Sequence, residues 1–301
     1  MGHKSFITLD LEFMGRPGTI AAYLLPHRSG AALVECGPGS TLEALQAGLH
    51  AHGYTPGDIS DVFLTHIHLD HAGAAGWLSR QGARIHVHPV GAAHLLDPEK
   101  LLASAQRIYG EHMQRLWGEF LPVLPDRLSV LSDNQTIEIE ELRLRAVDTP
   151  GHAEHHFAYI FDDVCFSGDI GGVRMHGFQH LRLPMPPPEF HLEKWRQSVK
   201  RLQAETFQYI APTHFGLFSD PQRHLAALWQ ALDEIEAWME AVMPANPDFE
   251  SLNLGFLKWT EQRSLAAGLS VEQLQAYELA NPSWMSTYGI QRYWRKQRQP
   301  G

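Results

Sequence analysis

The sequence has little of what marks secreted and membrane proteins. It has two cysteines, Cys36 and Cys165, among 301 residues. Both lie in apolar, strand-like runs, so we expect buried thiols and no disulfide framework. No stretch approaches 18 uninterrupted apolar residues, and the first residues lack the apolar segment and cleavage pattern of a signal peptide. These absences predict a soluble, cytoplasmic protein with no membrane partner.

Basic residues are also in the minority. Lys and Arg number 24 against 34 Asp and Glu, which gives a formal net charge of −10. Proteins that bind nucleic acid usually present a basic stripe to the phosphates, so we expect no nucleic-acid partner. The basic cluster over 292–298 is interpreted as the cationic end of a helix.

Histidine, by contrast, is abundant, with 19 copies. His66, His68, Asp70 and His71 follow a short apolar strand predicted over 61–65. Residues two apart on an extended segment face the same way, so His66, His68 and Asp70 can converge. His71 begins the next predicted helix. Imidazole and carboxylate groups suit zinc, manganese or iron.

Three further segments place a potential ligand on a loop at the end of a predicted strand. His152 follows Thr-Pro-Gly, Asp169 follows Ser-Gly, and His214 lies in the segment Pro-Thr-His-Phe-Gly. Loops at strand ends can meet along one edge of a sandwich. The sequence therefore predicts a metal-binding edge assembled from four separate segments.

The order of predicted elements indicates the fold class. Strands follow strands as well as alternating with helices, which favours a mixed α/β sandwich over a doubly wound sheet. Helical spacing of apolar residues predicts one helix over 98–120. We expect a catalytic domain over 1–220 and an all-α extension over 221–301.

Together, the segments THIHLDH, TPGH, SGD and PTHFG resemble the metallo-β-lactamase superfamily, nearer to its glyoxalase II-like hydrolases than to its antibiotic-resistance branch. The resemblance spans 19–216 and implies a four-layer αββα sandwich of the α/β (α+β) class. It implies two divalent metal ions per chain, with zinc expected and manganese or iron as alternatives. One ion would bind His66, His68 and His152, the other Asp70, His71 and His214, and Asp169 would bridge them.

By the same resemblance, a metal-bridging hydroxide would attack a small-molecule ester, thioester, lactone or phosphodiester, with Asp70 as the catalytic residue that orients it. Two other functions stay open: an iron-dependent redox enzyme similar to persulfide dioxygenases, and a metal-stabilised binding protein without catalysis. His68 favours hydrolysis, because the family's flavin-linked diiron oxidases have Glu at that position.

The loop after Asp169 is predicted to contact substrate through Arg174, His176, Phe178 and His180, because loops on a rigid scaffold commonly carry specificity. Glu35 can make a hydrogen bond behind the ligands, and His155 and His156 either orient ligands from behind or belong to a polar strand edge. His86 and His88 are interpreted as core or surface histidines and not as ligands. The helical extension is expected either to line the substrate cleft or to mediate a homodimer.

Overall fold

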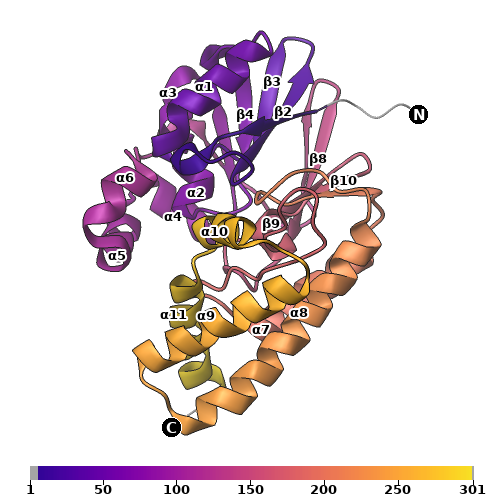
Figure 1. The fold of residues 1–301 in the computed structure, drawn as a ribbon. Helices are drawn as coiled ribbons and strands as arrows, with labels where there is room; N and C mark the ends of the chain where they lie inside the picture. Colours follow the sequence, from indigo (N-terminus) through magenta and orange to yellow (C-terminus); the bar gives the residue numbers. More distant parts are fainter. Residues whose placement is uncertain (1–5, 300–301) are drawn as a thin grey trace.

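The computed structural model describes residues 6–299 and contains two β-sheets packed face to face (Figure 1). The first sheet contains, in spatial order, β1 (Ile7–Asp10), β2 (Ala21–His27), β3 (Gly30–Val34), β4 (Ile59–Phe63), β5 (Arg84–Val87) and β6 (Leu128–Val130). The second contains β7 (Thr136–Ile139), β8 (Leu142–Asp148), β9 (Phe157–Phe161), β10 (Val164–Phe166) and β11 (Tyr209–Ala211).

Alternation along β2 explains why two sheets form. Ala21, Tyr23 and Leu25 point into the core between the sheets. Ala22 and Leu24 point the other way, into a second core beneath the helices of the first half. A strand buried on both faces needs a layer on each side. Here the second sheet covers one face of β2 and the helices cover the other.

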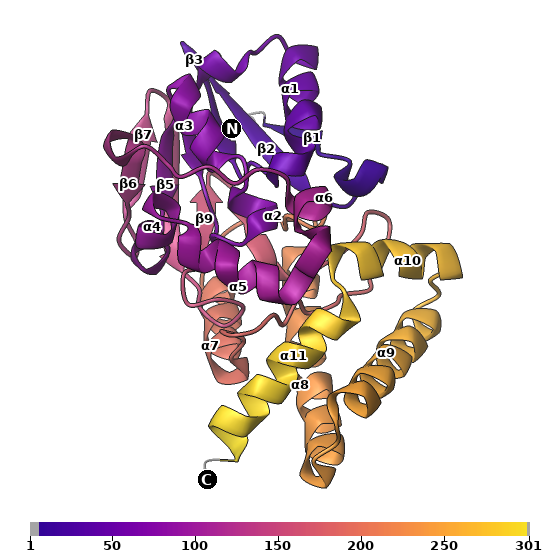
Figure 2. The same ribbon diagram turned by 90° about the vertical axis from the view of Figure 1, so that its left-hand side faces the viewer.

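Helices supply the two outer layers. α1 (Leu42–Ala51) and α3 (Ala75–Gln81) cover the first sheet, whereas α7 (Leu192–Gln203) and α8 (Pro221–Val242) lie against the second (Figure 2). On α7, Trp195, Val199 and Leu202 are fully buried at helical spacing. The predicted four-layer αββα sandwich is confirmed.

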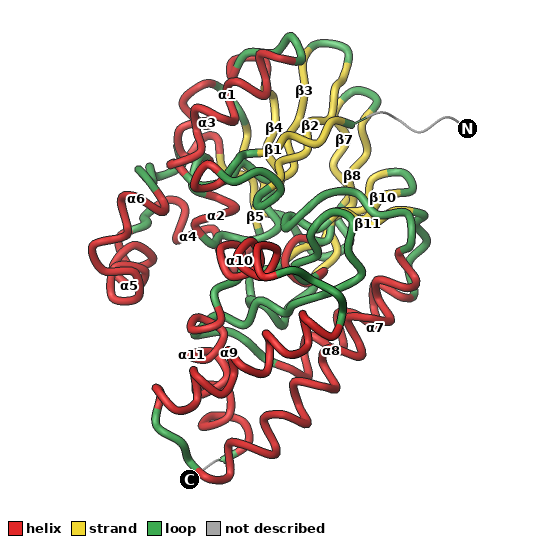
Figure 3. The backbone as a smooth tube through the Cα atoms, in the orientation of Figure 1, coloured by secondary structure: helices red, strands yellow, loops and turns green. Residues whose placement is uncertain are grey.

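The C-terminal region is helical, as predicted. It continues from α8, which begins against the second sheet, through α9 (Phe249–Ala266), α10 (Val271–Ala280) and α11 (Ser283–Tyr293). Figure 3 shows α9 and α11 on the other side of the strand-end loops from the sheets. Trp238 packs its ring against Phe256 and Trp259, which joins α8 to α9. None of the helices within residues 6–299 combines the length and apolarity that a membrane crossing requires.

The single helix predicted over 98–120 is wrong. The chain forms α5 (Glu99–Tyr109) and the short α6 (Met113–Trp117), with a 3-10 turn between them. Gly110 ends α5 with a φ of +54°, a conformation that glycine adopts without a Cβ clash. Two further short helices belong to this half of the chain, α2 (Leu69–Ala72) and α4 (Pro89–Leu96). α4 begins with a proline, which the first position of a helix accepts because its amide would have no helical partner there.

Strand direction brings the predicted ligands to one edge. β8 and β9 are antiparallel, as are β9 and β10, so β8 and β10 run the same way, and β11 is parallel to β10. Their C-terminal ends therefore lie together, next to the loop that follows β4 (Figure 3). The four ligand-bearing segments leave from these four strand ends.

Candidate metal centre

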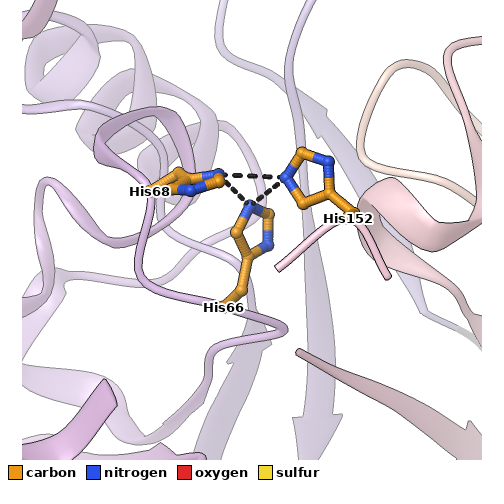
Figure 4. A group of neighbouring side chains, drawn as sticks. All are labelled: His66, His68 and His152. Atoms are coloured by element: carbon orange, nitrogen blue, oxygen red, sulfur yellow. Dashed lines mark hydrogen bonds between the residues drawn. The ribbon is translucent and has the colours of Figure 1, made fainter. Parts of the chain in front are cut away.

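Three histidine rings converge at the first group of donors. His66 Nε2 lies 2.9 Å from His68 Nδ1, His152 Nε2 lies 3.0 Å from that same atom, and the Nε2 atoms of His66 and His152 are 3.2 Å apart (Figure 4). A neutral imidazole has one N–H, so this triangle brings lone pairs together. Tetrahedral zinc with Zn–N bonds of about 2.1 Å separates its ligand atoms by about 3.4 Å, close to these spacings.

The second group contains Asp70, His71 and His214, whose donor atoms also lie near enough to share an ion. Asp70 Oδ2 is 3.6 Å from His71 Nε2 and 3.5 Å from His214 Nε2. His71 Nε2 is buried and has no hydrogen-bond partner. A buried nitrogen without a partner is costly unless something else binds it, and a metal ion fits that requirement.

Asp169 lies between the two groups. Its Oδ1 is 3.4 Å from His71 Nε2 and 3.5 Å from His214 Nε2, while its Oδ2 is 3.3 Å from His152 Nε2. The Oδ1 atom is buried without a hydrogen-bond partner. Each carboxylate oxygen thus faces a different donor group, which is the geometry a bridging ligand needs.

The outward nitrogens of four rings have acceptors that fix the tautomer. His152 Nδ1 donates to the Pro184 carbonyl at 2.8 Å, and His214 Nδ1 donates to the Thr19 carbonyl at 2.8 Å. His71 Nδ1 faces Glu35 at 3.1 Å. His66 Nδ1 lies 3.0 Å from the Thr65 hydroxyl. In each ring the proton is held on the outer nitrogen, and the inner nitrogen is left free for a metal.

Glu35 links the two groups from behind. Its Oε1 accepts hydrogen bonds from Thr65 Oγ1 at 2.5 Å and Thr213 Oγ1 at 3.1 Å, besides the contact with His71. Because Thr65 donates to Glu35, its oxygen is free to accept the proton of His66. Glu35 is fully buried; its Oε1 is occupied by these contacts, whereas its Oε2 is buried without a hydrogen-bond partner. Because Glu35 contacts His71 at Nδ1, the nitrogen that points away from the other donors, we interpret it as a partner of the ligands.

Electrostatics also favour bound cations. Glu35, Asp70 and Asp169 place three carboxylates in one buried region, and within residues 6–299 no Lys or Arg forms an ion pair with any of them. Burial opposes protonation of His71, but the charges of Asp70, Asp169 and Glu35 outweigh it and raise its pKa. Protons on imidazole offset this negative charge in the metal-free site, and divalent ions would replace them.

In the three-histidine group, by contrast, the pKa values of the rings are lowered. Burial, reinforced by the neighbouring rings, lowers the pKa of His66 well below its ordinary value, and that of His68 falls to about 3. Burial is also the main cause of the lowered pKa of His152. These rings are therefore neutral at pH 7, which is the form that binds a metal.

A cavity of about 760 Å³ opens onto both groups. Its inner end is formed by His68, Asp70, His152, Asp169 and His214. Its wall is mostly apolar and comes from α5 and α6, the loop over 184–189 and the chain around α11; the large side chains include Leu101, Ile108, Tyr109, Leu116, Trp117, Met185, Trp284 and Met285. The ring of Tyr109 packs edge-on against those of Trp117 and Trp284, which joins the two sides of the cavity.

The four predicted substrate residues do not line this cavity. Arg174 makes a bidentate ion pair with Asp220 and lies 4.0 Å from the centre of the Phe218 ring. His180 is buried against Ser264. His176 and Phe178 likewise lie outside the lining. The loop reaches the cavity only farther on, at Pro184–Glu189, because the preceding residues pack against α8, α9 and α10.

Three other histidines lie near the donors or the neighbouring strands. His156 accepts from the Ile170 amide and pairs with Thr149, so it supports the turn that carries Asp169. His155 receives a bond from the Ile67 amide and faces Glu189 at 3.2 Å, on the cavity side. His86 pairs with Asp61 at 2.7 Å, away from the donors.

The comparison with known families decides the chain's membership. The model of the metallo-beta-lactamase superfamily matches residues 15–214. This chain belongs to that superfamily. Among curated relatives, the metallo-beta-lactamase fold-containing protein ST1585 of Sulfurisphaera tokodaii is 28% identical over 162 residues, covering 52% of the chain and 61% of that protein.

Two other relatives of this metallo-β-lactamase-superfamily chain carry enzyme names. Atrochrysone carboxyl ACP thioesterase of Aspergillus fumigatus is 27% identical, covering 69% of the chain and 56% of that protein. Hydroxyacylglutathione hydrolase of Acidiphilium cryptum is 30% identical, covering 75% of the chain and 79% of that protein. The chain spans about three fifths of the lengths of ST1585 and of the atrochrysone carboxyl ACP thioesterase. Among solved structures, TTHA1429 of Thermus thermophilus superposes with a TM-score of 0.63 at 23% identity, covering 98% of this chain and 95% of that one.

Proposed function

We propose that this chain is a hydrolase that uses two divalent metal ions to cleave a carboxylic ester or thioester. The observation that carries the proposal is the position of Asp169, with one carboxylate oxygen facing each donor group. His66, His68 and His152 would hold one ion, and Asp70, His71 and His214 the other. Imidazole and carboxylate donors at near-tetrahedral spacing favour zinc, with manganese or iron as alternatives.

Bound divalent ions would supply Lewis acidity, which makes water a nucleophile near neutral pH and polarises a carbonyl oxygen. The protein's own part is positional. Asp70 and Asp169 both lie at the inner end of the cavity, but Asp70 faces His71 and His214 through Oδ2, so its Oδ1 can accept a proton from attacking water. The apolar wall displaces bulk water from the reacting carbonyl and strengthens the electrostatic interactions there.

The residues that line the cavity also indicate the chemical class of the substrate. Its wall is apolar, yet Lys100 and Arg115 line it and neither forms an ion pair within residues 6–299. An apolar wall with two unpaired cations matches a substrate that joins a large apolar group to an anionic group. The relative named as an acyl carrier protein thioesterase supports a thioester as the bond cleaved.

Elemental analysis of metal-replete protein tests the centre. We expect about two metal ions per chain, and less than one would contradict a dinuclear site. Iron as the bound metal, together with oxygen uptake in the presence of persulfides, would instead support the redox alternative. Loss of hydrolysis in Asp70→Asn with an unchanged fold would exclude a non-catalytic binding protein.

Four thioesters test the substrate: octanoyl-coenzyme A, acetyl-coenzyme A, and the octanoyl and acetyl thioesters of uncharged N-acetylcysteamine. We expect the highest kcat/KM for octanoyl-coenzyme A, which is both apolar and anionic. Arg115→Gln should raise KM for the coenzyme A thioesters alone. Arg107→Gln is the matched control, because Arg107 is an exposed residue of α5 that does not line the cavity. Equal kcat/KM for all four compounds would contradict this substrate class, and a preference for lactones or phosphodiesters would contradict the bond type.

A further inference from the structure

We propose that the C-terminal helices orient the metal ligand His152 through the carbonyl group of Pro184. The proposal rests on the proposed function only in taking His152 as a ligand. It gives α11 and the turn before it a positioning role in the centre, although neither contributes a donor atom.

The chain of contacts begins at the ring of His152. Its Nδ1 donates to the Pro184 carbonyl at 2.8 Å, which directs Nε2 toward His66 and His68. The ring is buried, with the indole of Trp195 edge-on to it at 5.9 Å between ring centres. A ring nitrogen that donates to a fixed acceptor sets the rotation of the imidazole about its Cβ–Cγ bond, so the position of the Pro184 oxygen determines where Nε2 points.

Hydrogen bonds from the C-terminal region hold the backbone on both sides of Pro184. Asn281 Nδ2 donates to the Leu183 carbonyl at 3.2 Å, and the Met185 amide donates to Ser286 Oγ at 3.3 Å. Ser286 Oγ also donates to Asn281 Oδ1 at 3.3 Å, so the two side chains form one unit. Both are buried. The Pro184 carbonyl and the Met185 amide belong to one planar peptide group, so the hydrogen bond from Met185 to Ser286 also fixes the direction of the carbonyl.

The backbone of α11 approaches the same segment closely at Gly289. A Cβ atom added there would lie 1.9 Å from the Met185 carbonyl oxygen and 3.0 Å from the carbonyl carbon of Pro186. The helix therefore lies directly against the loop, and any side chain at this position would displace it. This contact is independent of the hydrogen bonds of Asn281 and Ser286, and it acts on the same stretch of chain.

Contacts from α9 and α10 hold the segment that leads to Pro184. Tyr277 of α10 donates its hydroxyl to the His180 carbonyl at 2.9 Å and accepts the Met175 amide at 3.0 Å. Arg182 forms an ion pair with Glu278 and donates to Ser264 Oγ at 3.2 Å. The segment from Met175 to Met185 is therefore held by α9, α10 and α11 along its length.

Two glycines in the same helical region provide a matched experiment. Gly289→Ala should displace the loop, whereas Gly255→Ala in α9 meets only Trp238 at 3.9 Å, an ordinary contact. In a zinc titration against a competing chelator, we expect Gly289→Ala to raise the dissociation constant of one of the two ions about 10- to 100-fold. This is the range for losing a hydrogen-bond partner behind a metal ligand. With cobalt(II) in place of zinc, its visible absorption bands should shift. Gly255→Ala should match the wild type in both measurements.

Ser286→Ala is a milder test than Gly289→Ala, because it removes the hydroxyl that binds the Met185 amide without adding bulk. Ser286→Thr restores this hydroxyl and should therefore restore the wild-type affinity. Histidine ¹⁵N–¹H NMR of the metal-free protein adds a readout that needs no metal. The Nδ1 proton of His152 should exchange faster with solvent in Ser286→Ala than in the wild type or Ser286→Thr.

The outcomes separate this inference from the proposed function. Wild-type zinc affinity, cobalt spectrum and proton exchange in a folded Ser286→Ala variant would overturn the positioning role and leave the hydrolase proposal standing. Failure of the wild-type protein to bind two ions would contradict the dinuclear proposal, while the NMR comparison would still report on the contact between His152 and Pro184.

Discussion

Replacing Glu35 by Gln isolates the contribution of the buried charge behind the two donor groups. The substitution keeps the shape of the side chain and one acceptor oxygen, so Thr65 and Thr213 retain a partner. It removes the negative charge that faces His71 Nδ1 at 3.1 Å. A carboxylate behind a histidine ligand raises the basicity of the ring, and its loss typically weakens metal binding about 10- to 100-fold. That range corresponds to about 1.4 to 2.8 kcal/mol.

The effect should fall unequally on the two ions. His71 belongs to the second group and contacts Glu35 directly, whereas His66 belongs to the first group and reaches it only through Thr65. Zinc titration against a chromophoric chelator resolves the two equivalents. We expect the dissociation constant of one equivalent to rise 10- to 100-fold and that of the other to change less than threefold.

Asp61→Asn is the matched control for Glu35→Gln. Asp61 is also a buried carboxylate that pairs with a histidine, His86, at 2.7 Å, but that histidine is not among the metal donors. Its replacement should lower the free energy of unfolding and leave both zinc affinities unchanged. If Glu35→Gln binds both ions as the wild type does, or if Asp61→Asn weakens them equally, the reasoning from the outer carboxylate fails.

Three further predictions address the bridge, the predicted substrate loop and acid stability. Asp169→Asn replaces one bridging oxygen by an NH₂ group, so elemental analysis should find about one metal ion per chain instead of two. Arg174→Ala should lower the free energy of unfolding in urea by about 3 kcal/mol, the lower end for breaking a buried pair, because Asp220 is partly exposed; an altered KM at unchanged stability would indicate substrate contact instead. Burial lowers the pKa of His224 to about 4 from 6.5, so the unfolded chain binds the extra proton first as pH falls. The metal-free protein should lose about 3 kcal/mol of stability between pH 7 and pH 4 from this group, and His224→Gln should lose correspondingly less.

Local pattern predicts a mixed α/β sandwich and ligands that meet at strand ends, whereas the four layers and the division of the donors between two ions are implied by the resemblance to the superfamily. Alternation in β2 requires cores on both faces, and the spacing of His66, His68 and Asp70 on an extended segment aims them together. Each remaining donor follows a strand directly, and strands end at the edges of sheets. The structure brings all seven predicted donors to one edge for this reason.

The outer partners of the ligands are less predictable. Backbone carbonyls, such as those of Pro184 and Thr19, hold two of the rings, and a carbonyl has no signature in the sequence. Glu35 does have a signature in the sequence, because it is an acidic residue just before a glycine-rich turn, and this position indicates a supporting role.

The cavity wall is unpredictable for a different reason. The apolar residues at helical spacing on α5, such as Leu101 and Ile108, predict a buried face without telling whether a core or a substrate covers it. Similarly, the sequence of the loop after Asp169 is compatible with substrate contact along its whole length. Only the packing of α10 against it shows that its first half, with Arg174 and His180, is enclosed.

The two sides of the cavity differ in how freely they can change. α5 and α6 end at Gly110 and Gly118, project to one side of the sandwich (Figure 1) and hold none of the seven metal donors. The opposite wall includes α11, whose close approach at Gly289 fixes the loop behind His152. Libraries randomised at Leu101, Ile108 and Leu116 should therefore yield catalysts with new acyl preferences, whereas libraries on the loop-facing side of α11 should yield mostly metal-deficient protein. An engineer wishing to retarget this scaffold has one adjustable wall and one fixed wall.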